Sequence, residues 1–457
     1  MFSKRIIVGC THRMWRFRRI STVTGVCLLS CLLVNPWDIA RASSEPGSSS
    51  NTSEAVLRLQ ELLPELLRVN PELRAAQKRY EASLTRAPQE SALPDPKLTF
   101  GWISNGAPLP GFGLGSEPTS NIGFQLSQEF PYPGKRSLKE SIAKKASGSQ
   151  AQEYRALQLN LIWRLKLAFQ ELRFSYGALD ILSRNRSVLR RLSEAVAYRY
   201  SIGKASQQDL IRSQLEISIL EKRVLSAEQK KQGQEAEINE LLNRPVRRRL
   251  PPPEPAPALP ELVDEETMQR RMSEAAPVLR FQRELIDQRH FGMQLAQKEY
   301  YPDFEVMSGY YNMGGLKDMW EFKLRVNVPV FFWHKQRPGL EEASLRLTEA
   351  QKSYQAIQQN LAFKLHERHL AAETARKLSD LYSQRLLPQA QLALESGVTG
   401  YEAGSADFVT VLQNFNSILD SELGSLEQQT EYLKALAGLE ELMASASDLS
   451  DSGEVQP

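Results

Sequence analysis

Hydrophobic and polar residues alternate along four short stretches of the chain, and a helical period fills most of the rest. The clearest alternation is EFKLRVNV, residues 321–328, in which every second side chain is apolar. A period of two predicts a β-strand with one apolar and one polar face. The same pattern predicts three further strands, at residues 97–104, 120–129 and 303–311.

Long helical segments surround these strands. The predicted order is the same in both halves of the chain: a helix, two strands, a very long helix, a glycine-containing turn and a returning helix. The helices are expected at 54–91, 137–198 and 206–243, and again at 262–299, 340–396 and 405–443. Pro64 and Pro71 are expected to break the first of them. The second contains no proline, so it predicts a helix of roughly 90 Å, which suggests coiled-coil packing.

The two halves also match in sequence. LPDPKLTFG at 93–101 corresponds to YPDFEVMSG at 301–309, and FQLSQEFP at 124–131 corresponds to FKLRVNVP at 322–329. Because the matches keep their order and a similar offset, they predict one repeat that is used twice. The expected organisation is a signal peptide at 1–42, a Ser-rich linker at 43–53, repeat 1 at 54–248, a Pro-rich linker at 249–261, repeat 2 at 262–443 and a C-terminal tail at 444–457.

Residues 1–42 have the features of an export signal. A basic stretch precedes the apolar run Ile20–Val34, and Ala40-Arg41-Ala42 supplies a small-x-small cleavage site. An alternative is acylation of Cys31 in the sequence Leu-Leu-Ser-Cys, but the apolar run continues past this cysteine, which favours cleavage after Ala42. All three cysteines lie in this segment, so the mature chain is expected to have no disulfide.

Beyond residue 42 the charge is nearly balanced. The chain has 57 basic and 54 acidic residues, of which the first 42 residues hold seven and one. The remaining 50 basic and 53 acidic residues show none of the basic bias of nucleic-acid-binding proteins. No later stretch approaches the roughly 18 apolar residues that a transmembrane helix requires.

The strands have aromatic side chains on their apolar faces and strongly polar opposite faces. A soluble four-stranded sheet is one explanation, but the strand length and the aromatic faces favour a membrane barrel. Because four strands cannot close such a barrel, several copies must contribute, and three copies supply twelve strands. The expected lipid-facing residues are Phe322, Leu324, Val326 and Val328, and the expected lumen-facing residues are Lys323 and Arg325.

Several motifs are shared with a known family. Leu93-Pro94-Asp95-Pro96, the sequence EFPYPGKR at 129–136, the duplicated layout and the paired Tyr-x-x-Gly turns make the mature chain resemble the outer-membrane efflux (TolC) family over its whole length. The resemblance implies a mainly α-helical homotrimer, whose twelve-stranded transmembrane β-barrel continues into a long periplasmic α-helical barrel. It also implies a passive exit duct in outer-membrane lipid, joined through a periplasmic adaptor to an inner-membrane transporter. The first two motifs are most similar to the branch that exports heavy-metal cations.

The same resemblance implies two groups of site residues. An adaptor is expected to dock at two turns, whose residues are Tyr200, Gly203, Lys204, Ala205, Tyr401, Gly404, Ser405 and Ala406. A periplasmic gate is expected at Asp209, Tyr401, Asp407, Thr410 and Gln413. The Asp209 carboxylate is expected to accept a hydrogen bond from the Tyr401 hydroxyl. Ala406, Thr410 and Gln413 replace charged residues that are frequent in the family, so this gate is expected to be built differently, with Asp407 as a substitute acid.

Nothing in the sequence predicts an enzyme or a bound cofactor. The chain has no Walker loop, HExxH or G-x-S-x-G motif. His366 and His369 share one helix face, but no third ligand is evident, so no metal site is expected. Two alternative functions remain open: an outer-membrane duct for type I protein secretion, and a soluble periplasmic coiled-coil scaffold.

Overall fold

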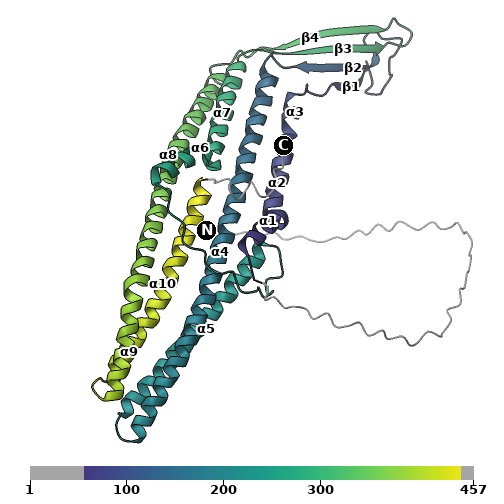
Figure 1. Ribbon diagram of the computed structural model, residues 1–457. Coiled ribbons are helices and arrows are strands. Elements are labelled where there is room, and N and C mark those ends of the chain that lie inside the picture. Colours follow the sequence, from purple (N-terminus) through teal and green to yellow (C-terminus); the bar gives the residue numbers. More distant parts are fainter. Residues whose placement is uncertain (1–55, 444–457) are drawn as a thin grey trace, which may run out of the picture. The chain divides into compact units, whose positions relative to one another are not determined.

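A computed structural model describes residues 56–443, all within the unit Glu54–Pro457. The expected signal peptide with Cys31, the Ser-rich linker and the C-terminal tail lie outside the described residues. Figure 1 shows a four-stranded sheet at one end of a set of long helices, and the turns between the helices at the other end.

In the described residues of the first half, from residue 56 onward, the chain forms five helices. They are α1 (Leu59–Val69), α2 (Pro71–Leu84), α3 (Arg86–Ser91), α4 (Lys135–Ser201) and α5 (Gln207–Leu241). Asn70 separates α1 from α2, and its side chain accepts a hydrogen bond from the Leu73 backbone amide at 3.0 Å, while Pro71 occupies the first turn of α2. The break expected at Pro71 is confirmed. The break expected at Pro64 is wrong, because α1 continues through this proline.

The second half has a similar succession of shorter helices, two strands and longer helices, but the number of helical segments differs. It contains α6 (Glu265–Ala275), α7 (Pro277–Lys298), α8 (Gln336–Leu381), the π-helical turn η1 (Tyr382–Leu386), α9 (Leu387–Ala403) and α10 (Phe408–Met443). The helix expected at 340–396 is therefore interrupted by a π-turn. Pro388 follows that turn and has no amide hydrogen to donate, so the wider π-turn accommodates the missing helical bond.

Among the described elements α4 is the longest, with 67 residues, which corresponds to about 100 Å. It begins after Gly134 and ends before Gly203, both with positive φ, at 93° and 75°. Within α4, Gly177 faces a neighbouring helix, since a Cβ atom there would lie 2.7 Å from the Leu426 side chain of α10. The absence of proline thus permits the length, and the glycine permits close packing.

The strands form one antiparallel sheet in the order β1-β2-β3-β4. They are β1 (Lys97–Ile103), β2 (Asn121–Phe130), β3 (Asp303–Asn312) and β4 (Met319–Asn327). Each lies where the alternating pattern predicted a strand, and only the ends differ by one or two residues. Val328 consequently lies just after β4 instead of inside it.

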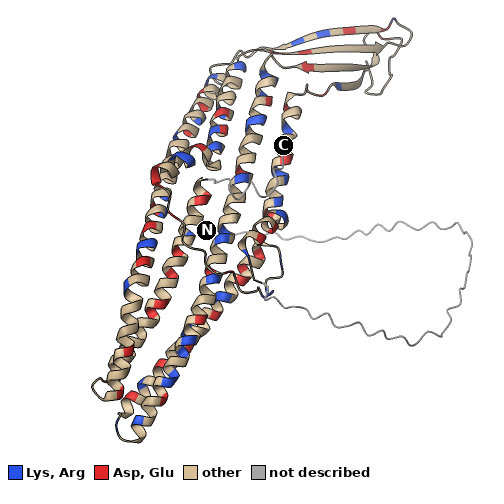
Figure 2. Cartoon of the chain, in the orientation of Figure 1, with Lys and Arg blue, Asp and Glu red and all other residues tan. Residues whose placement is uncertain are grey.

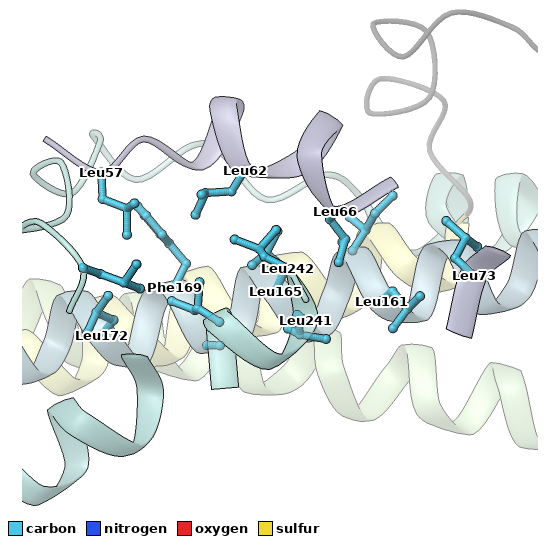
Figure 3. Close-up of a cluster of buried hydrophobic side chains, with 14 residues drawn as sticks. Leu57, Leu62, Leu66, Leu73, Leu161, Leu165, Phe169, Leu172, Leu241 and Leu242 are labelled. Carbon is cyan, nitrogen blue, oxygen red and sulfur yellow. The ribbon is translucent and has the colours of Figure 1, made fainter. Parts of the chain in front are cut away.

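Within residues 56–443, three clusters of buried side chains hold the helices together. Figure 3 shows the one in which α1, α2, α4 and α5 meet around Leu66, Leu165 and Phe169. A second joins α6, α7, α8 and α10, and a third joins α4, α5, α9 and α10.

The Pro-rich segment contacts two of these clusters. The Pro252 carbonyl accepts a hydrogen bond from the Leu57 amide at 2.9 Å, and the Pro260 carbonyl accepts one from the buried Tyr432 hydroxyl at 2.5 Å. The segment at 249–261 is therefore attached to the helical core at these two points.

Acidic and basic side chains are interspersed along the helices (Figure 2). Several pair across helix contacts; for example, the Lys145 ammonium of α4 lies 2.8 Å from the Asp287 carboxylate of α7. Among residues 56–443, no helix combines the length and the apolar character needed to cross a bilayer.

Candidate functional site

One face of the sheet carries an aromatic and aliphatic band. The strand register places Phe100, Phe124, Tyr310 and Trp320 side by side across all four strands. Neighbouring rings in this row have centroid separations of 6.3, 5.9 and 5.0 Å. Phe322 and Leu324 extend the band along β4 and are 78% and 63% exposed. An exposed apolar band of this extent on a sheet is typical of a surface that meets lipid or another protein.

The opposite face of the sheet is polar and internally paired. Lys323 forms an ion pair with Glu321, and the Arg325 guanidinium lies 2.6 Å from the Glu305 carboxylate. Met307 is buried on this face and accepts a hydrogen bond from the Gln125 amide at its sulfur, at 3.2 Å. The expected lumen-facing pair, Lys323 and Arg325, therefore lies on the face opposite Phe322, Leu324 and Val326, as strand alternation requires.

Two glycines on the polar face are covered by one tyrosine. A Cβ atom at Gly123 would lie 2.5 Å from the Tyr311 ring, and one at Gly309 would lie 2.8 Å from it. The Tyr311 hydroxyl then donates to the Glu321 carboxylate at 3.0 Å. The tyrosine thus fills the space that the missing side chains leave, which helps to set the register of β2 and β3.

The outer strands, β1 and β4, each have one neighbour within the described part of the chain. Their free edges therefore present unpaired backbone amides and carbonyls. Because the sheet is antiparallel with four strands, β1 of one copy can pair with β4 of another in antiparallel orientation. This geometry permits a closed barrel that is built from several copies.

The two helical turns at the far end from the sheet have similar local structures. Gly203 and Gly404 have φ angles of 75° and 82°, which end α4 and α9 in the left-handed conformation that glycine tolerates best. The Lys204 amide donates to the Arg199 carbonyl, and the Ser405 amide donates to the Gly400 carbonyl, both at 2.8 Å. Among the expected docking residues, those exposed to solvent are Tyr200, Gly203, Lys204, Gly404 and Ser405; Ala205 and Ala406 are half-buried, and Tyr401 is buried.

The gate residues are arranged differently from the prediction. Asp209 does not receive a hydrogen bond from Tyr401; its carboxylate accepts one from the Ser206 hydroxyl at 2.8 Å and caps the start of α5. The Tyr401 hydroxyl is buried and has no hydrogen-bond partner among residues 56–443, and burial raises its pKa. The expected bond is wrong because the capping box offers Asp209 a partner only three residues away.

Arg199 makes the contact between the two turns instead. Its guanidinium donates to the Tyr401 carbonyl and, at 3.3 Å, to the Glu402 carbonyl. The same group lies 4.4 Å from the centroid of the Tyr401 ring, which is a cation–π geometry. The sequence prediction missed Arg199, although it stands directly before Tyr200 in the motif that marks the turn.

Asp407, Thr410 and Gln413 lie near the start of α10. The Asp407 carboxylate accepts hydrogen bonds from the Thr410 amide at 2.9 Å and the Thr410 hydroxyl at 2.5 Å. These bonds from Thr410 lower the pKa of Asp407. Gln413 is exposed. The Asp407 side chain therefore caps the start of α10.

The histidines of α8 have separate partners. The His366 ring lies 3.0 Å from the Glu265 carboxylate, whereas His369 contacts the Val263 carbonyl at 3.2 Å. Across residues 56–443, no group of three or more His, Cys, Asp or Glu side chains could hold a metal ion.

We call the sheet face that carries the apolar band the lipid-type face. A sheet with this face, a polar opposite face and long helical hairpins that follow it has the features of a channel wall that is extended by helices. The chain belongs to the outer membrane efflux protein family, whose model matches residues 62–244 and 272–445. The members of this family are channel proteins, located in the bacterial outer membrane and extending into the periplasm, and this location applies to the present chain. Among curated proteins, no sequence matches the chain.

Solved structures support the fold. The outer-membrane channel OprN superposes with a TM-score of 0.71 at 16% identity, covering 87% of this chain and 91% of that one. CusC, described as a transmembrane channel, has a TM-score of 0.71 at 16% identity, with 88% and 95% covered. VceC from Vibrio cholerae, an outer membrane protein, has a TM-score of 0.71 at 16% identity, with 84% and 95% covered.

Proposed function

We propose that the chain is the exit duct of a tripartite efflux pump and works as a homotrimer. The observation that carries this proposal is the pair of free strand edges on a sheet with one lipid-type face. Unpaired edges are not tolerated in lipid, so β1 and β4 must find partners in other copies. Three copies supply twelve strands, which suffice to enclose an aqueous lumen.

In this arrangement the apolar band faces lipid and the polar face lines the lumen. Lys323 and Arg325 then border the water-filled passage, while Phe322, Leu324, Val326 and Val328 meet the membrane. The ion pairs with Glu321 and Glu305 leave the lumen polar but compensate its charge locally. Such a wall favours passive conduction over tight binding of a substrate.

The two helical turns are the proposed docking places for a periplasmic adaptor, which in turn binds an inner-membrane transporter. Their support is the exposure of Tyr200 and of the neighbouring Ile202, which are 43% and 48% exposed at the end of α4. Exposed apolar side chains beside a rigid glycine turn suit an interface with another helical protein.

The proposed substrates are heavy-metal cations, on the strength of the Leu93–Pro96 motif and of the sequence EFPYPGKR. A duct for type I protein secretion is the alternative, since the same wall serves both. A strain that lacks the chain distinguishes the two. Greater sensitivity to metal salts supports the first, and loss of a secreted protein with unchanged metal tolerance supports the second.

Labelling of single cysteines tests the duct itself. Lys323→Cys and Leu324→Cys are made separately in a mature chain without other cysteines, and intact outer membranes are treated with a charged or a lipid-soluble thiol reagent. We expect position 323 to react with the charged reagent and position 324 only with the lipid-soluble one. Equal labelling of both positions by the charged reagent would contradict a membrane-embedded wall.

A further inference from the structure

The connection between β4 and α8 exposes aromatic side chains beside basic ones. Phe331 and Trp333 are 68% and 48% exposed, and Phe332 lies between them in the sequence. Lys335 and Arg337 follow within four residues and are exposed as well. We call residues 328–337 the aromatic–basic connection.

This connection has a defined conformation. The His334 amide donates to the Phe331 carbonyl at 3.1 Å, and the Arg337 amide donates to the Phe332 carbonyl at 2.8 Å. The ring centroids of Phe332 and Trp333 are 5.1 Å apart and the ring planes lie at 76° to each other. The Phe332 centroid is also 6.2 Å from that of Tyr300. The aromatic groups are therefore held in place although they are exposed, which lowers the entropy lost on binding a partner.

The equivalent connection in the first half is different. There, Lys135 is buried and paired with Asp303, and the Arg136 guanidinium donates to the Ser91 carbonyl at 2.8 Å. In contrast, neither the Lys335 nor the Arg337 side chain has a hydrogen bond or ion pair within residues 56–443. Two unpaired positive charges beside exposed rings suit an anionic partner with an apolar part.

We propose that the aromatic–basic connection binds the headgroups of phospholipids in the periplasmic leaflet of the outer membrane. The connection continues the lipid-type face of β4 at the end where the chain passes into the helices, so it lies at the level of the membrane surface. Aromatic rings are favoured at that level, and Lys and Arg bind phosphate there while their stems lie along apolar groups. This proposal rests on the proposed function, because it requires β4 to face lipid.

Quenching of tryptophan fluorescence tests the position. In the full chain, all tryptophans except one are changed to Phe, leaving Trp333, Trp320 or Trp163. The trimers are placed in vesicles of phosphatidylethanolamine and phosphatidylglycerol, with bromine on the acyl chains near the glycerol or near the chain middle. We expect Trp333 to be quenched about twofold more by bromine near the glycerol, and Trp163, which lies in α4, to be quenched by neither.

Trp320 separates the possible failures, because it lies on the lipid-type face of the sheet itself. If Trp320 is quenched and Trp333 is not, a second copy or another protein covers the connection, and the lipid-binding proposal is overturned while the duct stands. If neither is quenched, the sheet does not face lipid and both proposals fail.

A charge variant tests the phosphate contact. The double variant Lys335→Gln, Arg337→Gln is expected to bind phosphatidylglycerol about 30-fold more weakly than the unchanged trimer, as measured by native mass spectrometry, since each basic residue near an anionic surface contributes about fivefold. The matched control is Lys352→Gln, Lys364→Gln, which neutralises two exposed lysines further along α8. Equal weakening in both variants would show a general charge effect and overturn the assignment to this connection.

Discussion

The buried Lys135 ammonium lies 3.0 Å from both carboxylate oxygens of Asp303. Lys135 begins α4 and Asp303 begins β3, so the pair joins the two halves of the chain where the sheet meets the helices. The Asp303 carboxylate also accepts a hydrogen bond from the Tyr132 amide at 2.7 Å. The rings of Tyr132 and Tyr301 stack on each other, with a distance of 4.5 Å between their centroids. These contacts tie the start of α4 to the start of β3.

The first prediction concerns this ion pair. Lys135→Met leaves the half-buried Asp303 carboxylate without its buried cation, and we expect a loss of about 2 kcal/mol or more in the free energy of unfolding. Urea unfolding of the purified protein, followed by circular dichroism, measures the loss. Lys144→Met is the control, because Lys144 is 64% exposed in its ion pair with Glu140, and we expect it to cost less than about 1 kcal/mol. Equal costs for the two variants would rule out a special role for Lys135.

The second prediction concerns the contact between the turns. Arg199→Ala removes the hydrogen bonds to the Tyr401 and Glu402 carbonyls and the cation–π contact, so the two turns are expected to separate more readily. The open probability in planar bilayers should rise by about tenfold, and Arg199→Lys should have a smaller effect because an ammonium retains the charge but not the planar contact.

Arg191→Ala provides the comparison for this experiment. Arg191 is exposed on the same helix and should leave the open probability unchanged. If Arg199→Ala also leaves it unchanged, the turns are held by other contacts.

The third prediction compares two glycines that pair across β1 and β2. A Cβ atom at Gly123 would lie 2.2 Å from the Tyr310 carbonyl oxygen, whereas one at Gly101 would have nothing within 4 Å. Gly123→Ala should therefore displace β3 and cost about 2 kcal/mol or more, while Gly101→Ala should be nearly neutral. The temperature at which the proposed trimer dissociates on electrophoresis measures both variants. A neutral Gly123→Ala would show that the close packing of β2 on β3 is not required.

The fourth prediction concerns pH and the start of α10. Because the pKa of Asp407 is lowered in the folded chain, its cap stabilises the helix above the ordinary Asp value near 3.8 and is lost as the pH falls through the lower folded pKa. The protection of the Thr410 amide against hydrogen exchange, measured relative to its intrinsic exchange rate at each pH, should therefore fall in acid. Asp407→Ala should show low protection at all pH values. Asp407→Asn keeps an acceptor but cannot titrate, so protection that still falls in acid in this variant would show that another group is responsible.

The strands and turns were predictable from the sequence because their signals are local. Alternation along 321–328 placed β4 to within two residues, and Gly203 and Gly404 marked the turns because few other residues adopt positive φ without strain. The family resemblance likewise came from short motifs, and the match of the outer membrane efflux protein family confirms it.

The partners of individual side chains were decided only by the tertiary structure. Asp209 was expected to bind Tyr401, but it caps its own helix, and Arg199 crosses to the second turn instead. Lys135 and Asp303 belong to two separate motifs of the sequence and are 168 positions apart, yet their side chains pair. Such contacts depend on how distant segments pack, which no local period records, whereas a period of two or a glycine acts within a few residues of the backbone.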